Sequence, residues 1–253
     1  MRIVRFQHQG TTAYGLVEGE TVYALEGDPY SEFQRGAAVA PLVTVRLLAP
    51  CQPSKVVAVG LNYRDHAVET HNVLPAEPLL FLKPPTSVIG PGEAIVRPTM
   101  SQQVDHEAEL AVVIGRRAHK VSPAEAPGYI LGYTCANDVT ARDIQRQERH
   151  NSRAKSFDTF CPLGPWIVTG LSPDDLGIRC RVNGVLWQDS RTSQLVFGVQ
   201  ALVSFVSQVM TLLPGDVVLT GTPAGIGPLA SGDVVEVEIE GVGVLRNTVR
   251  RDT

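Results

Sequence analysis

The fold is decided by residues 105–113, which read DHEAELAVV. The run 110–114 is apolar throughout, as in a buried strand. Side chains alternate along a strand, so Glu107 and Glu109 should point to one face, about 6.6 Å apart at roughly 3.3 Å per residue. Two carboxylates that close repel each other unless a cation or a proton lies between them. Because the rest of the stretch is apolar, we expect this pair to lie near a core.

A third acidic residue, Asp138, closes another apolar stretch, which begins at Tyr133. Three carboxylates without a suitably placed cysteine are typical of a site for a hard divalent ion, Mg²⁺ or Mn²⁺. Water or substrate would complete the octahedral coordination of this ion. The same pattern has a second interpretation, a solvent-facing edge strand with two ordinary glutamates, and spacing alone does not choose between the two.

Short strands and tight turns predominate in the rest of the chain. The sequence holds 23 glycines and 18 prolines, a surplus that favours turns. Asn183-Gly184 lies between two short strand-like stretches and predicts a two-residue hairpin. Helices are expected at 140–149 and 199–212. The predicted fold class is therefore α+β but mainly β, with a mostly antiparallel core rather than a doubly wound parallel sheet.

The first 53 residues predict a small N-terminal β-rich domain. Residues 1–7 alternate in character, and 26–40 show little periodicity, so we expect the latter to form a loop or a short irregular helix. Residues 50–54 mark the boundary, and a second, larger domain is expected over 54–253.

Composition and charge exclude several classes of function. The formal net charge is −4 over 253 residues, so nucleic acid is not an expected partner. No apolar run approaches the roughly 18–20 residues of a membrane span, and the N-terminus has no signal-peptide pattern. The four cysteines are widely spaced and predict neither a disulfide framework nor a zinc knuckle. We expect a cytoplasmic protein without membrane or nucleic-acid partners.

His66 and Glu69 are three residues apart and would share a face of a helical turn. A carboxylate beside an imidazole raises its basicity and fixes its tautomer, as a general base requires. The alternative is a casual contact on a surface helix.

Further polar groups are candidates for contacts with an anionic substrate. Lys155 could neutralise an anionic substrate or a developing negative charge, although most lysines do neither. Arg142 and Gln145 on the expected helix are further candidates for contacts, with the same reservation that most such residues have no such role. The glycine-rich loop 219–227, with Gly221 near its start, offers backbone N–H groups to an anion. It lacks a nucleotide-binding pattern and could equally be a tight turn.

The order of these signals resembles the fumarylacetoacetate hydrolase superfamily. The resemblance extends from about residue 56 to the C-terminus and rests on six motifs: Gly60-x-Asn62-Tyr63-x-x-His66-x-x-Glu69, Phe81-Leu82-Lys83-Pro84, His106-Glu107-x-Glu109-Leu110, Asp138-x-Thr140-Ala141-Arg142-Asp143, Lys155-Ser156-Phe157 and Thr220-Gly221-Thr222-Pro223.

The resemblance implies a catalytic domain with a mixed, rolled β-sheet, a small N-terminal domain and a homodimer. It implies Mg²⁺ or Mn²⁺ held by the three positions Glu107, Glu109 and Asp138. It implies that His66 is the base that activates water and that Glu69 orients this base. The remaining implied roles are substrate contacts, which fall on Lys155, Gln145 and Thr222, with Arg142 in the same wall. The segment of His66 and Glu69 behaves as a lid in several members.

The chemistry that the resemblance implies begins with a small 2-oxo acid chelated to the metal as an enolate. We expect C–C bond hydrolysis of acylpyruvate-type 2,4-dioxo acids, because the His/Glu pair is present. Isomerisation of 2-hydroxyhepta-2,4-diene-1,7-dioate, decarboxylation of 5-oxopent-3-ene-1,2,5-tricarboxylate and decarboxylation of oxaloacetate are the alternatives within the family. A protein that binds metal and anion without catalysis is the alternative of another class.

Overall fold

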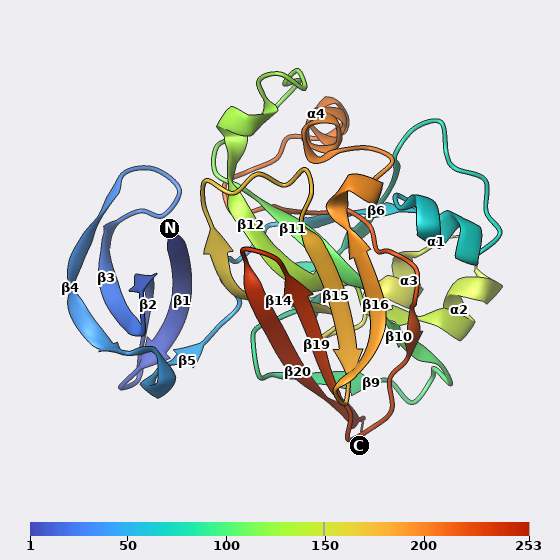
Figure 1. The fold of residues 1–253 in the computed structure, drawn as a ribbon, viewed down its shortest axis with the longest axis horizontal. Coiled ribbons are helices and arrows are strands. Elements are labelled where there is room, and N and C mark those ends of the chain that lie inside the picture. Colours follow the sequence, from blue (N-terminus) through green and yellow to red (C-terminus); the bar gives the residue numbers. More distant parts are fainter. Residues whose placement is uncertain (149, 253) are drawn as a thin grey trace.

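A computed structural model of the chain describes residues 1–148 and 150–252. The described residues form three β-sheets with short helices around them (Figure 1). The largest sheet runs in the order β4-β3-β2-β1-β14-β12-β11-β17-β6-β7, with β5 on β1 and β8 on β14. The second has five strands in the order β16-β15-β19-β20-β9, and the third has three, β13-β10-β18.

The strands are mostly short, and their bounds are β1 Arg2–His8, β2 Thr11–Glu18, β3 Thr21–Gly27, β4 Phe33–Pro41, β5 Arg46–Leu47, β6 Val56–Gly60, β7 Leu79–Lys83, β8 Val88–Ile89, β9 Ala94–Arg97, β10 Val104–His106, β11 Ala108–Ile114, β12 Ile130–Asn137, β13 Thr140–Ala141, β14 Cys161–Val168, β15 Gly177–Val182, β16 Val185–Arg191, β17 Val217–Leu219, β18 Gly227–Pro228, β19 Val234–Ile239 and β20 Gly243–Arg251. The α-helices are α1 Arg64–Glu69, α2 Arg142–Gln147, α3 Ser152–Lys155 and α4 Val199–Val209, and the 3₁₀ turns are η1 Leu42–Thr44, η2 Pro85–Ser87, η3 Ala126–Tyr129 and η4 Thr192–Gln194.

The mainly β fold class is confirmed, and the sheets are mixed. Most pairs are antiparallel, but β17 pairs with β6, β14 with β8 and β20 with β9 in parallel. The hairpin at Asn183-Gly184 joins β15 to β16, with positive φ at both turn residues (+52° and +79°).

The expectation of a loop or irregular helix at residues 26–40 was wrong. Most of this segment forms β4, an edge strand that pairs with β3. The register of this pair shifts twice, next to Tyr23, so the side chains of β4 do not follow a regular alternation. An irregular edge strand lacks the period of two that sequence analysis depends on.

The expected helices are shorter in the structure. The helix predicted at 140–149 is preceded by strand β13 and spans only Arg142–Gln147 as α2; Arg149 lies outside the described residues. The helix predicted at 199–212 ends at Val209. None of the helices in the described part of the chain has the length and apolar character that a bilayer crossing requires.

Residues 1–53 carry strands β1–β5 and lie to one side of the molecule, shown in blue in Figure 1. They join the rest through β1, which pairs with β14 at Arg2 and Ile3. The sheet is therefore continuous across the predicted boundary. The division into domains at residues 53 and 54 stays a prediction.

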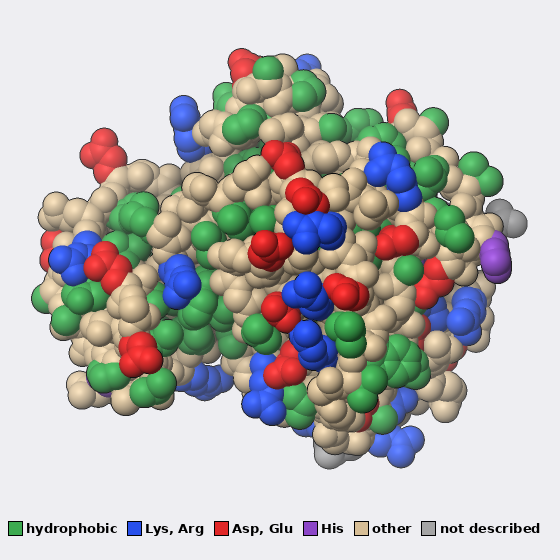
Figure 2. All heavy atoms as spheres, in the orientation of Figure 1, with side chains coloured by type: hydrophobic (Ala, Val, Ile, Leu, Met, Phe, Trp, Pro, Cys, Tyr) green, Lys and Arg blue, Asp and Glu red, His purple; other side chains and the backbone are tan. Residues whose placement is uncertain are grey.

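The five-stranded sheet has one apolar and one charged face. Along β19 every second residue is buried, and the intervening glutamates pair with arginines of neighbouring strands, as in Arg181–Glu238 and Arg246–Glu236. Figure 2 shows these alternating positive and negative side chains over β15, β16 and β19. The apolar face packs toward β11 and β12, so β11, whose residues are all buried, is enclosed on both sides.

The parallel pairing of β17 with β6 starts at a buried aspartate. Asp216 is fully buried and accepts hydrogen bonds from the backbone N–H groups of Ser54, Lys55 and Leu213 (2.9, 3.2 and 2.8 Å). It also accepts from the Ser54 hydroxyl (2.6 Å) and forms an ion pair with Lys55 (2.5 Å). This one carboxylate fastens the starts of both strands.

We expect Asp216→Ala to lower the free energy of unfolding by about 3 kcal/mol, the lower end for breaking a buried ion pair, because Lys55 can turn toward water. Urea denaturation followed by circular dichroism measures the change. Asp189→Ala is the matched control: its carboxylate pairs with Arg179 on the surface, and its loss should cost less than about 1 kcal/mol. Equal losses in the two variants would contradict this account.

Candidate active site

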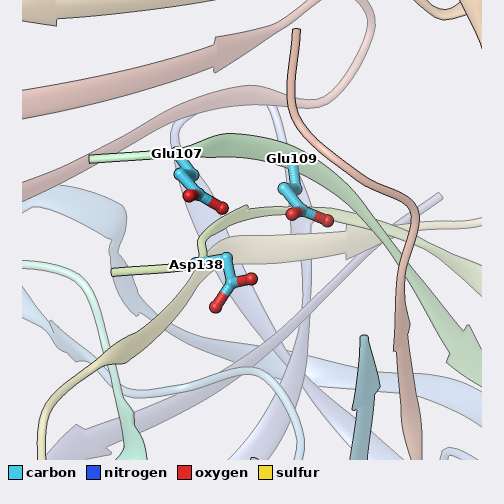
Figure 3. Close-up of side chains that lie close together, drawn as sticks. All are labelled: Glu107, Glu109 and Asp138. Carbon is cyan, nitrogen blue, oxygen red and sulfur yellow. The ribbon is translucent and has the colours of Figure 1, made fainter. Parts of the chain in front are cut away.

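The three predicted metal-ligating carboxylates lie together (Figure 3). One oxygen from each of Glu107, Glu109 and Asp138 lies within 4.8 Å of the others, and all three residues are at most 4% exposed. The carboxylates therefore form a buried cluster, and the alternative interpretation, two ordinary glutamates on a solvent-facing edge strand, is wrong.

The chain changes sheets at Glu107, which the sequence did not predict. Residues 105–113 form not one strand but two, because β10 belongs to the three-stranded sheet and β11 to the large one. The N–H of Glu107 donates to the side chain of Asn137 (2.9 Å) and its carbonyl accepts from the N–H of Asp138 (2.8 Å). These two bonds hold Asp138 opposite Glu107, at the end of β12.

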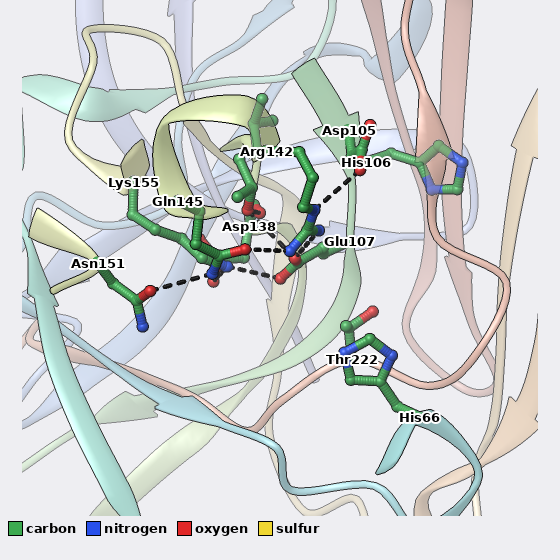
Figure 4. A network of polar contacts seen from close by, with 12 residues as sticks. His66, Asp105, His106, Glu107, Asp138, Arg142, Gln145, Asn151, Lys155 and Thr222 are labelled. Atoms are coloured by element: carbon green, nitrogen blue, oxygen red, sulfur yellow. Dashed lines mark hydrogen bonds and ion pairs between the residues drawn. The ribbon is translucent and has the colours of Figure 1, made fainter. Parts of the chain in front are cut away.

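Three buried cations surround the cluster. Lys155 donates to Glu107 (2.6 Å) and Asp138 (2.7 Å), and Lys83 donates to the other oxygen of Asp138 (2.5 Å). Arg142 donates to Glu107, Gln145 and Asp105, the last at 2.9 Å (Figure 4).

Sequence reasoning gave no role to Lys83 or Asp105. Lys83 is 1% exposed although it ends the strand β7, and Asp105 is 2% exposed beside Arg142. A lysine at the end of an apolar strand, followed by proline, was the available signal for the first. Asp105 had no comparable signal, because its partner is 37 residues away.

The electrostatics of the cluster favour a bound cation. The described residues place four carboxylates here, those of Asp105, Glu107, Glu109 and Asp138, against the cations Lys83, Arg142 and Lys155. With all four carboxylates ionised, one formal negative charge is in excess. Glu109 has no ion-pair partner among the described residues and accepts only the N–H of Gly221 (2.6 Å).

The two glutamates differ in the pKa of their carboxyl groups. Burial, followed by the charges of Asp138 and Glu107, raises the pKa of Glu109 well above its ordinary value. Burial also acts to raise the pKa of Glu107, but Lys155 and Arg142 outweigh it, so that pKa lies below the ordinary value. A divalent cation would relieve the repulsion at Glu109, and the all-oxygen donor set suits Mg²⁺ or Mn²⁺.

The His66–Glu69 contact predicted from their spacing is present in α1. His66 Nδ1 lies 2.9 Å from one carboxylate oxygen of Glu69, and the other oxygen accepts the N–H of Gly225 (2.9 Å). A carboxylate can only accept, so in the neutral imidazole the proton lies on Nδ1 and the lone pair on Nε2. This is the tautomer that a base acting through Nε2 requires.

One pocket of about 700 Å³ collects nine of the ten predicted site residues: His66, Glu69, Glu107, Glu109, Asp138, Arg142, Gln145, Lys155 and Thr222. Gly221 is the exception. Its N–H group points at Glu109 instead of at the pocket, so it holds a carboxylate of the chain itself rather than the expected anion. Asn151 also lines the pocket and accepts from Gln145 (3.0 Å). The roles of these residues in catalysis and binding stay predictions.

Comparisons with known proteins confirm the resemblance. Residues 55–250 match the family described as fumarylacetoacetate (FAA) hydrolase, C-terminal, and residues 1–50 match the one described as Rv2993c-like, N-terminal. A 5-carboxymethyl-2-hydroxymuconate delta-isomerase from Mycobacterium smegmatis has 47% identity and a TM-score of 0.94, with both chains fully covered. A 2-hydroxyhepta-2,4-diene-1,7-dioate isomerase from Mycobacterium marinum has 46% identity and a TM-score of 0.93, covering 100% of this chain and 99% of the other. A mitochondrial oxaloacetate tautomerase of Bos taurus is 47% identical over 224 residues, 83% of this chain and 71% of the relative.

Changing Glu109 to Gln should weaken Mg²⁺ binding by about 100-fold or more, since even residues behind a ligand contribute 10–100-fold. Isothermal titration calorimetry measures this, with Glu20→Gln, an exposed substitution, as the control. Unchanged Mg²⁺ affinity in Glu109→Gln would contradict the three-carboxylate site.

The same substitution should stabilise the metal-free protein, and more at pH 8 than at pH 5. Folding raises the pKa of Glu109, so stability falls as the pH rises from the unfolded pKa toward the folded one; glutamine lacks this loss. Thermal melting of both proteins in EDTA at the two pH values measures the difference. A variant that melts below wild type at pH 8 would show that the ionised carboxylate is not repelled.

Proposed function

Because this chain belongs to the fumarylacetoacetate hydrolase family, we propose that it is a divalent-metal-dependent enzyme that hydrolyses a C–C bond of acylpyruvate-type 2,4-dioxo acids. The observation that carries the proposal is the His66–Glu69 pair, which shares one pocket with the carboxylate cluster. Hydrolysis needs a base for water beside an anchor for the 2-oxo acid, and this pocket offers candidates for both.

Glu107, Glu109 and Asp138 would hold the ion, Mg²⁺ or Mn²⁺. When bound, the ion supplies Lewis acidity toward the carboxylate and keto oxygens of a 2-oxo acid. With a divalent ion, the cluster of four carboxylates and three cations changes from one negative charge to one positive charge. An anionic substrate is then favoured in a pocket that would otherwise repel it.

The chain's own residues account for the hydrolytic step. His66 Nε2 takes a proton from water while Glu69 holds the imidazole at Nδ1. The water oxygen bonds to the carbonyl carbon distal to the carboxylate, and the bond from that carbon to the central CH₂ breaks. The CH₂ carbon keeps the electron pair and takes a proton back from His66, so the products are pyruvate and a carboxylic acid.

Cationic side chains in the same wall would stabilise the charge that develops. Lys155 lies at hydrogen-bonding distance from two carboxylates. Once those carboxylates bind an ion, the ammonium group of Lys155 can donate a hydrogen bond to a substrate oxygen. Arg142 donates to Glu107 and Gln145, so we assign it to holding that wall in place.

We also propose that the chain acts as a homodimer.

A second candidate function is isomerisation or decarboxylation at the same site. Isomerisation is favoured by the full-length similarity to two proteins named as isomerases and by the relative named as an oxaloacetate tautomerase. In this case His66 would move a proton between carbon atoms of a dienoic or 2-oxo diacid, and no water would be consumed. Decarboxylation of oxaloacetate would need neither water nor its activation.

Replacing His66 by Ala separates hydrolysis from decarboxylation. Hydrolysis of acetylpyruvate should fall by about 10²–10⁴, the contribution of a general base, whereas decarboxylation of oxaloacetate should fall much less. Mg²⁺ affinity should be almost unchanged, because the three carboxylates are untouched. Both reactions are followed through the loss of enol absorbance at saturating Mg²⁺.

His71→Ala is the matched control, because His71 is an exposed histidine at the end of the same segment and does not line the pocket. Equal losses of both reactions in His66→Ala would assign His66 to substrate placement instead of water activation. No turnover of acetylpyruvate, oxaloacetate or a dienoic diacid by wild-type protein would favour the non-catalytic binding class.

A further inference from the structure

Gln188 reaches the active site from the five-stranded sheet, yet it does not line the pocket. Its side chain is fully buried and makes four hydrogen bonds. The amide nitrogen donates to the hydroxyl of Thr222 (2.8 Å) and to the carbonyl of Pro223 (2.8 Å). The amide oxygen accepts the N–H of Ala108 (2.9 Å) and lies 3.2 Å from Nδ1 of His106.

A β-bulge in β16 directs Gln188 inward. Cys180 pairs with Gln188 and Arg181 pairs with Leu186, so Trp187 is the extra residue between them. A bulge re-aims the side chains beside it. Trp187 packs over the glycine-rich loop: a Cβ at Gly225 would meet its carbonyl oxygen at 2.0 Å, and a Cβ at Gly227 would meet its ring at 2.2 Å. The loop that carries Thr222 is therefore seated on this bulge.

The partners of Gln188 leave only one orientation of its amide. The carbonyl of Pro223 can only accept a hydrogen bond, so the amide nitrogen must face it. The N–H of Ala108 can only donate, so the amide oxygen must face that group. A flipped amide would place its oxygen against the carbonyl oxygen of Pro223 and its NH₂ group against the N–H of Ala108. The nitrogen is thus a donor toward Thr222.

Donation by Gln188 fixes the direction of the Thr222 hydroxyl. The hydroxyl oxygen accepts from Gln188, and within the described residues this is its only hydrogen-bond partner. Its hydrogen is left to point elsewhere, and Thr222 lines the pocket. Were Gln188 an acceptor, the hydroxyl would donate to it and would present a lone pair to the pocket instead.

We propose that Gln188 is a positioning residue that makes Thr222 a hydrogen-bond donor to an oxygen of an anionic 2-oxo acid substrate. The inference rests on the proposed function and on the contact between Thr222 and substrate that the resemblance to the family implies. A carboxylate or keto oxygen offers only lone pairs, so a hydroxyl held as a donor attracts it and a hydroxyl held as an acceptor repels it. Gln188 thereby adds to the selection of oxygen-rich anions.

The first experiment tests the contact itself. Thr222→Val removes the hydroxyl at constant shape and should weaken binding of oxalate, used as the probe in the presence of Mg²⁺, by about 10–100-fold, the worth of a hydrogen bond to a charged group. Thr222→Ser keeps a hydroxyl and should retain most of the affinity. If Thr222→Val binds oxalate as wild type does, the expected contact between Thr222 and substrate is wrong, and the inference falls with it.

The second experiment reverses the hydroxyl. Gln188→Glu keeps the shape of the side chain but presents an acceptor to Thr222, so the hydroxyl should donate to it and oxalate affinity should fall by about 10–100-fold. Gln188→Met frees the hydroxyl without adding a charge and should give a smaller loss. In the Thr222→Val background, Gln188→Met should cost less than about threefold and Gln188→Glu should cost less than it does beside Thr222, because interacting positions are not additive.

The third measurement separates positioning from support of the metal strand. Gln188 also holds the N–H of Ala108, between Glu107 and Glu109. Mg²⁺ affinity, measured by calorimetry without oxalate, should stay within about threefold of wild type in Gln188→Met, which is the additivity limit for uncoupled sites. The KM for acetylpyruvate should rise more than kcat falls.

Two outcomes would overturn the inference while leaving the proposed function in place. One is a loss of oxalate affinity on changing Gln188 that is the same with and without the Thr222 hydroxyl. The other is a Gln188→Met protein that loses Mg²⁺ affinity or fails to fold, which would assign Gln188 to support of the strand or of the core.

Discussion

The structure depends on burying an excess of negative charge where two sheets meet. Four carboxylates lie in a region that is almost closed to solvent, and three of them come within 4.8 Å of each other. Such a cluster is stable only with opposite charges beside it, because unpaired buried charges are costly. Lys83, Arg142 and Lys155 supply those charges from three separate elements, and the one remaining charge makes the place suitable for a divalent cation.

The arrangement of the sheets keeps this cluster in place. The chain leaves one sheet at His106 and enters another at Ala108, so Glu107 lies at the crossing. Strand β12 brings Asp138 to the same point, and the start of the glycine-rich loop holds Glu109 through the N–H of Gly221. Gln188, from strand β16 of the five-stranded sheet, connects the strand of the carboxylates to the loop of Thr222 through its hydrogen bonds. A shift of any one of these sheets would therefore move the side chains that the others hold in the cluster.

The chemistry follows from the contrast between the two sides of the pocket. One side is dense in paired charges and, in the proposed function, would anchor an anion once a cation is bound. The other side carries the imidazole of His66, whose proton is held at Nδ1 by Glu69, and Gly225 holds the second oxygen of that glutamate. If they act as the proposed base and anion anchor, these two sides fit reactions of 2-oxo acids in which a proton moves near a C–C bond, whether or not water takes part.

The sequence by itself determined the carboxylates, the His66–Glu69 pair and the mainly β class, because these depend on geometry within one strand, one helical turn or one hairpin. The choice between a metal site and an ordinary edge strand came from the order of the motifs, which resembles one family. Only the tertiary structure decided the contacts of Lys83 and Gln188, the break at Glu107 and the occupied N–H of Gly221. Lys83 is 55 residues from Asp138, and Gln188 is 80 residues from Ala108. The first contact joins strands that are far apart in the chain, and the second forms where separate sheets pack and a bulge turns a side chain; no local period in the chain encodes either event.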